Sequence, residues 1–201
     1  MGMIATFMAK PYAQQAGSGT HIHISLLNKN KENIFSDPQN ETGSKNLLHA
    51  IGGLSKTMKE SMAIFCPNAN SYRRFQPDLY VPMAPTWGID NRTVAIRIPT
   101  GPEKAKRIEH RVSGADANPY LVVASILAGI LYGMTHKIEP PKISIGDAIA
   151  KHKPSLPMTW VESLDAFSKS KILKEYFGKE FCHVYYQTKF KEMQIFDSHV
   201  T

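Results

Sequence analysis

The sequence predicts an α+β fold, in which a curved antiparallel sheet is backed by helices and followed by a mainly helical subregion over residues 141–201. Three segments show the period-two alternation of strands, at residues 20–27, 92–98 and 106–112. Two longer segments, at residues 44–64 and 118–136, have the apolar content of core helices. The 201 residues are 42% hydrophobic and 20% charged, which suits a globular chain with a sizeable core.

The three predicted strands are apolar on one face and polar on the other. Their polar residues are His21, His23, Ser25, Arg97, Glu109 and Arg111. Imidazole, carboxylate and guanidinium groups on one face suit an anionic ligand together with a divalent cation. Each feature also has a purely structural explanation, because strand histidines are more often hydrogen-bonded surface groups and Glu109 could simply form a cross-strand ion pair.

The helices have recognisable end signals. Ser44 is a candidate N-cap for the first, and Asn118 followed by Pro119 begins the second. Thr159-x-x-Glu162 predicts a capping box, and Gly178 separates a short helix from a last one near 180–198. Residues 67–90 contain four prolines and predict an irregular loop of the kind that often carries function. The uncharged stretch 117–135 contains two glycines and two tyrosines and predicts a buried helix, with no membrane span.

Composition narrows the class of protein. The net charge of +7 suggests anionic partners, but the scattered lysines and arginines argue against nucleic acid. The two cysteines, Cys66 and Cys182, have no metal-binding spacing and fit a reducing, cytoplasmic setting. The sequence has neither a P-loop nor a GxGxxG fingerprint, so a nucleotide would have to bind in another frame.

Five motifs, in order, resemble those of the glutamine synthetase family. They are KPYAQQAGSGTHIHIS (10–25), NSYRRFQP (70–77), DNRTVAIRIP (90–99), RIEHR (107–111) and ANPY (117–120). The helical tail, with TWVESLDAF and EYFGKEF, is also similar, so the resemblance covers essentially the whole chain. It implies an ATP- and Mg²⁺- (or Mn²⁺-) dependent glutamate–amine ligase that works through a γ-glutamyl phosphate. The implied substrates are glutamate, ATP and an amine, either ammonium or an alkylamine or polyamine.

The resemblance also implies roles by position. His21 and Glu109 match ligands of a catalytic divalent metal, and Ala16 and Gly17, with His21, match the turn that contacts glutamate. The nucleotide contacts match His23, Ser25, Arg92 and Arg97. The catalytic arginines that hold glutamate and the transferring phosphate match Arg74, Arg92 and Arg111.

Two departures from the family qualify this interpretation. Tyr80, three residues after Pro77, replaces the flap glutamate of glutamine-forming enzymes and favours the γ-glutamylpolyamine synthetase branch, unless Tyr80 only packs the loop. The chain also resembles only the C-terminal part of the catalytic domain, so we expect the N-terminal β-grasp domain and upstream catalytic portion to be absent. On this expectation the chain alone is inactive, and the complete protein is a ring-forming homo-oligomer. The alternative is a non-catalytic nucleotide- or glutamate-binding or oligomerisation fragment.

Overall fold

The computed structural model describes residues 2–76 and 79–199 and has an α+β fold, as the sequence predicts. Its four-stranded sheet has the order β1-β4-β3-β2. The strands are β1 (Ile22–Ile24), β2 (Trp87–Ile89), β3 (Ile96–Ile98) and β4 (Ile108–His110). The pairs β1–β4 and β3–β4 are antiparallel, with His23 opposite Glu109 and Arg97 opposite the same glutamate. Three of the polar residues predicted to share a face, His23, Glu109 and Arg97, are therefore direct cross-strand neighbours.

One strand corrects the prediction of a wholly antiparallel sheet, because β2 runs parallel to β3. The connection 90–95 is short and turns sharply at Asp90, whose φ of +43° lies in the left-handed region. The turn carries the chain back to the start of β2, where the N–H groups of Ala95 and Ile96 both donate to Thr86 O (3.1 and 3.0 Å). The predicted loop 67–90 thus ends in an edge strand and also contains the four-residue helix α2 (Ala69–Tyr72).

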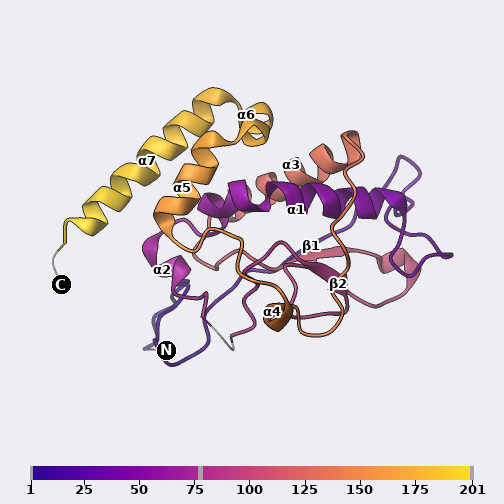
Figure 1. Ribbon diagram of the computed structural model, residues 1–201, viewed down its shortest axis with the longest axis horizontal. Coiled ribbons are helices and arrows are strands. Elements are labelled where there is room, and N and C mark those ends of the chain that lie inside the picture. The colour runs from indigo at the N-terminus through magenta and orange to yellow at the C-terminus, as the bar shows by residue number, and fades with distance from the viewer. Residues whose placement is uncertain (1, 77–78, 200–201) are drawn as a thin grey trace.

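Two long helices cover the apolar face of the sheet, α1 (Lys45–Phe65) and α3 (Pro119–Thr135), as Figure 1 shows. Both predicted caps are confirmed: Leu47 N–H donates to Ser44 Oγ (3.3 Å), and Tyr120 N–H donates to Asn118 Oδ1 (3.0 Å). The two helices pack backbone to backbone where a side chain on Gly53 would overlap Gly129 O. The stretch predicted to be a buried helix is therefore α3, packed along α1, but the prediction of burial holds for only part of it, because Tyr120, Val123, Leu127 and Leu131 are exposed.

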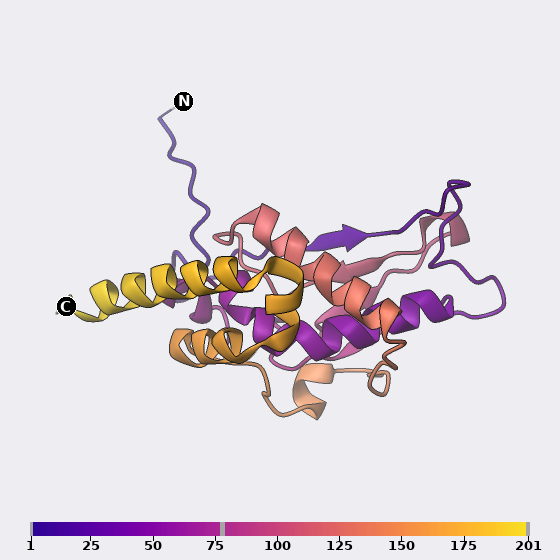
Figure 2. The same ribbon diagram turned by 90° about the horizontal axis from the view of Figure 1, so that it is seen from above.

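The C-terminal part of the chain is mainly helical and lies over one end of this layer (Figure 2). Its helices are α4 (Ala148–Lys151), α5 (Trp160–Lys169), α6 (Lys171–Phe177) and α7 (Lys179–Asp197). Earlier in the chain, a 3-10 turn, η1 (Glu103–Ala105), lies between β3 and β4. Thr159 caps α5, and the Glu162 carboxylate accepts from Met158 N–H (2.9 Å). Gly178, with φ of +86°, separates α6 from α7 as predicted.

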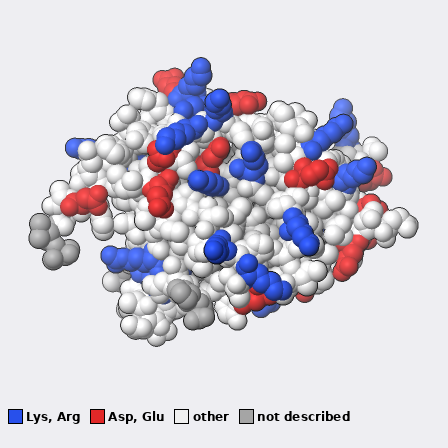
Figure 3. All heavy atoms as spheres, in the orientation of Figure 1, with Lys and Arg blue, Asp and Glu red and all other residues white. Residues whose placement is uncertain are grey.

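The core lies between the sheet and α1, so the polar face of the sheet points away from the helices. Ile96, Ile98 and Ile108 are fully buried against α1, whereas His21 and His23 on the other face are exposed. On the molecular face in Figure 3, basic and acidic side chains are interspersed. Every helix in the described part of the chain is too short or too polar to cross a membrane.

His110 is an exception to the apolar core. Its ring is 1% exposed and lies 4.7 Å from the Phe65 ring, and neither ring nitrogen has a hydrogen-bond partner among the described residues. Burial, with a smaller contribution from His21, lowers the pKa of His110 from 6.5 to about 3. The folded protein therefore holds this imidazole neutral at physiological pH.

We expect this histidine to make the fold sensitive to acid. The unfolded chain binds a proton at His110 below about pH 6.5, whereas the folded chain does so only near pH 3. The free energy of unfolding should therefore fall by up to about 1.4 kcal/mol per pH unit as the pH drops through this window. Urea titrations at pH 7.5 and 5.5 should show a smaller pH effect in His110→Leu than in the wild type. Equal pH effects in the two proteins would contradict the assignment.

Candidate active site

The centre of the polar face is the carboxylate of Glu109, whose side chain is 4% exposed. Arg111 Nη1 donates to Glu109 Oε1 (2.6 Å), and Arg97 Nη1 donates to Oε2 (2.9 Å). His21, the residue directly before β1, places its Nδ1 atom 3.1 Å from Oε1. The alternation of β1, β3 and β4 thus brings together four residues predicted from sequence.

Electrostatics keep this group ionised. Although burial opposes its charge, Arg111 and Arg97 hold the pKa of Glu109 below its usual value. Burial lowers the pKa of His21, and Arg111 lowers it further despite the nearby carboxylate. The site therefore combines an ionised carboxylate with a neutral imidazole, which are the protonation states required of metal ligands.

His21 and Glu109 could supply two of the ligands of a divalent cation. The His21 Nδ1 and Glu109 Oε1 atoms lie 3.1 Å apart on the polar face, and the His21 side chain is 42% exposed, so it can be reached from solvent. Within residues 2–76 and 79–199, no group of three or more His, Cys, Asp or Glu side chains could hold a metal ion. A hard cation bound here would complete its shell with water, substrate phosphates and further carboxylates.

The nucleotide residues predicted from sequence extend from this centre along β1 and β3. His23 Nδ1 accepts from Arg107 Nε (3.2 Å), and His23 Nε2 lies 4.0 Å from Glu109 Oε1. Ser25, exposed, follows on the same face of the chain. Arg97 is held from two sides, because it also donates to the carboxylate of Asp90.

A second group forms around Arg74, which is 3% exposed. Its Nη1 donates to Val112 O (3.3 Å), and its aliphatic stem lies directly under Gly17. A methyl group on Gly17 would come within 2.7 Å of Arg74 Cγ and 2.9 Å of Ala9 O, so only glycine fits. The predicted glutamate turn at Ala16 and Gly17 is thus built directly on Arg74.

Arg92 and Tyr80 share a third location, a cavity of about 820 Å³. Arg92 is exposed there, while its backbone carbonyl accepts from Arg111 Nη2 (3.1 Å), which ties the cavity to the Glu109 cluster. Tyr80 is 66% exposed, and its φ of +51° is left-handed. The remaining lining comes from both apolar and acidic side chains, including Ile89, Ile143, Ile145, Asp90 and Asp147. Pro77, from which the flap position is counted, lies outside the described residues.

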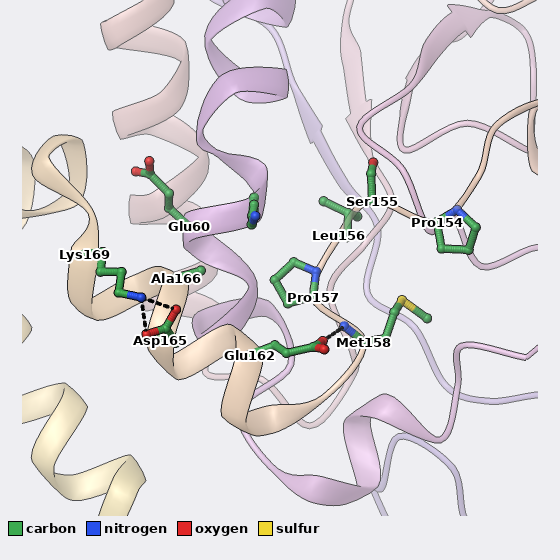
Figure 4. Close-up of a pocket in the computed structure, with 11 residues that line it drawn as sticks. Glu60, Pro154, Ser155, Leu156, Pro157, Met158, Glu162, Asp165, Ala166 and Lys169 are labelled. Carbon is green, nitrogen blue, oxygen red and sulfur yellow. Dashed lines mark hydrogen bonds and ion pairs between the residues drawn. The ribbon is translucent and has the colours of Figure 1, made fainter.

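A separate pocket lies away from these site residues. The pocket in Figure 4, of about 770 Å³, lies between α1, residues 154–158 and α5. Its lining includes Glu60, Glu162 and the Asp165–Lys169 ion pair, and none of the strand residues.

Some residues that shape the site were not predicted. Asp90 pairs with Arg97, and an Asp in the turn before Asn91-Arg92 was a usable signal. Asn70 accepts from Lys10 N–H (2.8 Å) and donates to Lys10 O (3.0 Å), which fixes the start of the segment that leads to the predicted glutamate turn. Asn68-x-x-Ser71 is a recognisable capping box, and it marks α2, which ends two residues before Arg74.

Comparisons with known proteins agree with the sequence motifs. The family described as glutamine synthetase, catalytic domain, matches residues 1–201. Gamma-glutamylputrescine synthetase PuuA of Escherichia coli (strain K12) is 46% identical over 99% of this chain and 42% of its own length. A glutamate–isopropylamine ligase of a Pseudomonas species is 37% identical over 99% of this chain and 44% of its own length.

The fold agrees as well. The solved structure of apo GmaS without ligand superimposes with a TM-score of 0.86 at 29% identity, covering 98% of this chain and 46% of that one. The chain spans less than half the length of the relatives it matches. Family match, sequence identity and fold together confirm the resemblance seen in the motifs: the chain belongs to the glutamine synthetase catalytic-domain family.

Proposed function

We propose that this chain supplies one part of the active site of an ATP- and Mg²⁺-dependent glutamate–amine ligase. The observation that carries the proposal is the Glu109 cluster, in which a buried carboxylate, two arginines and His21 meet on one face of the sheet. Such an arrangement suits phosphoryl transfer, which depends mainly on positioning and on neutralising charge.

The chain's residues have separate tasks in this proposal. Arg74, beneath the Gly17 turn, provides a fixed cation at the end of the glutamate site. Arg92, exposed in the cavity, is free to contact the γ-carboxylate and the phosphoryl group that it receives from ATP. His23, Ser25 and Arg97 orient the nucleotide, and Glu109 keeps Arg97 and Arg111 in place. A divalent cation held in part by His21 and Glu109 would neutralise phosphate charge during the transfer.

The amine is proposed to be an alkylamine or a polyamine. Tyr80 opens into the same cavity as Arg92, beside Ile89 and Ile143, so an alkyl chain would bury its methylene groups against apolar surface. The relatives point in the same direction, because their names specify putrescine and isopropylamine. Asp90 and Asp147 also line the cavity, which keeps it favourable for cationic ligands.

A chimera tests the reaction. The matching segment of the E. coli γ-glutamylputrescine synthetase would be replaced by this chain, and ADP release would be followed with glutamate, ATP, Mg²⁺ and each amine. Amine- and glutamate-dependent turnover is expected. A folded chimera without such turnover, beside an active parent, would refute the function.

The same chimera tests the amine preference. The kcat/KM for putrescine should exceed that for ammonium by at least about tenfold, because apolar contacts to an alkyl chain contribute discrimination of this order. Tyr80→Glu should lower that ratio about tenfold, since a carboxylate favours ammonium. Tyr80→Phe, the matched control, should retain it. A ratio that Tyr80→Glu leaves unchanged would mean that Tyr80 only packs the loop.

The alternative function is non-catalytic binding of nucleotide or glutamate by this chain alone. Assaying the isolated chain separates the two proposals, because binding of ATP or glutamate without turnover in either the chain or the chimera would favour the alternative. We further propose that the complete protein is cytoplasmic and a ring-forming homo-oligomer, which light scattering of the complete protein would test.

A further inference from the structure

We infer that Asp116, acting through helix α2, is a positioning residue for Arg74 and the Gly17 turn. Asp116 lies in the loop between β4 and α3, a part of the chain to which the proposed reaction assigns no role. This inference rests on the proposed function only in that Arg74 and the Gly17 turn are taken to bind glutamate. The geometry itself is independent of the ligand.

The first step runs from Asp116 to α2. Asp116 Oδ2 accepts hydrogen bonds from Asn68 Nδ2 (2.8 Å) and Ser71 Oγ (2.7 Å). Asn68 in turn caps α2 by accepting from the N–H groups of Asn70 (2.9 Å) and Ser71 (3.3 Å). Because a four-residue helix has almost no stability of its own, these side-chain bonds determine where it sits.

The second step runs from α2 to the glutamate turn. Asn70 clamps the backbone of Lys10 through both its side-chain oxygen and its side-chain nitrogen. The buried Lys10 ammonium donates to Gln15 O, and Ser18 N–H donates to Ala9 O (2.7 Å). The turn that carries Gly17 is therefore attached at its start to α2.

The third step places Arg74. This residue lies one residue beyond the C-cap of α2, Arg73, and its N–H donates to Ser71 O (3.4 Å). Its guanidinium and the second oxygen of Asp116 lie beside the same glycine: a methyl group on Gly114 would overlap Asp116 Oδ1 and come within 3.1 Å of Arg74 Nη1. Asp116 Oδ1 is buried and has no hydrogen-bond partner among the described residues. A buried carboxylate oxygen without a donor is unfavourable on its own, and the Arg74 guanidinium is the cation that lies beside the same glycine.

Hydrogen exchange on the isolated 201-residue chain tests this inference. Asp116→Ala frees Asn68 and Ser71, so the Ser18 and Lys10 amides should exchange about tenfold faster, as for a lost cap. Asp116→Asn is the conservative variant, because one side-chain oxygen can still accept both hydrogen bonds. It should restore both amides to near the wild-type rates.

The matched control is Asn33→Ala. Asn33 also clamps backbone, accepting from Phe35 N–H (3.0 Å) and donating to Lys106 O (2.8 Å), but at another loop. Faster exchange of Ser18 and Lys10 in Asp116→Ala than in Asn33→Ala, with recovery in Asp116→Asn, supports the inference. Equal exchange in the two alanine variants, or no recovery in Asp116→Asn, overturns it.

A second variant keeps the test decisive if Asp116→Ala does not fold. Asn70→Ala removes only the clamp on Lys10 and should accelerate Ser18 exchange while leaving the Asp116–Ser71 hydrogen bond intact. Unchanged Ser18 exchange in that variant overturns the inference. Hydrogen exchange is measured without substrate, so its result is independent of the proposed function. If the network positions Arg74 and the Gly17 turn but the chimera shows no turnover, only the proposed function is refuted.

Discussion

Glu109→Ala is expected to lower the free energy of unfolding of the chain by about 3–5 kcal/mol, the usual cost of leaving buried charges uncompensated. The substitution would leave Arg111 without its carboxylate partner and Arg97 with Asp90 alone, and the side chains of these arginines are only 8% and 16% exposed. Glu109→Gln should cost less, because the amide oxygen still accepts one arginine. Urea denaturation monitored by circular dichroism measures both.

The matched control is Glu139→Ala. Glu139 also faces a histidine, His49 (3.7 Å), but its side chain is 77% exposed, so its loss should change stability by no more than about 0.5 kcal/mol. A Glu109→Ala protein as stable as Glu139→Ala would show that the cluster is solvated, and the account of a buried carboxylate would fail.

Arg92→Ala is expected to lower kcat of the chimera by about 10²–10³, the typical effect of removing one preorganised donor to transition-state charge. Arg92 is exposed, and its side chain has no structural role among the described residues, so the fold of the variant should be unchanged. Its backbone carbonyl, which Arg111 uses, remains in the variant. The measurement is the steady-state rate of ADP release at saturating glutamate and amine, with thermal unfolding as the check on folding.

Lys142→Ala provides the control for Arg92. Lys142 is an exposed cation next to Ile143, which lines the cavity, but it does not itself line it. The substitution removes the same charge near the same cavity and should leave kcat within about twofold of the parent, as for a surface charge. Similar losses in both variants would indicate a general field effect rather than direct contact by Arg92.

Local patterns in the sequence predict much of this fold. The alternation in 20–27 and 106–112 identifies which side chains share the polar face, and it also places His110 on the apolar side, where it is buried. Ser44, Asn118, Thr159 and Gly178 act as helix signals because capping is a local interaction. The sequence alone does not predict which strand pairs with which in the sheet.

The missed features depend on contacts between distant segments. The parallel pairing of β2 depends on the sharp turn at Asp90, which no period-two pattern signals. Asp116 contacts Asn68, 48 residues earlier in the chain, so neither residue alone suggests the network around Arg74. The site residues are identifiable from sequence motifs, whereas the contacts of the residues that hold them are visible only in the three-dimensional structure.

The pairing of β1 with β4 has a consequence for how the chain folds. His21 and Arg111 meet although 90 positions separate them, whereas the β3–β4 pair closes over the short segment around η1. Closing the longer loop costs more conformational entropy, so the high contact order of β1 favours its docking after β3, β4 and α1 have assembled. On this order of events Glu109 meets its two arginines early and His21 late. Pulse-labelling hydrogen exchange during refolding would then protect the amides of β4 before those of β1.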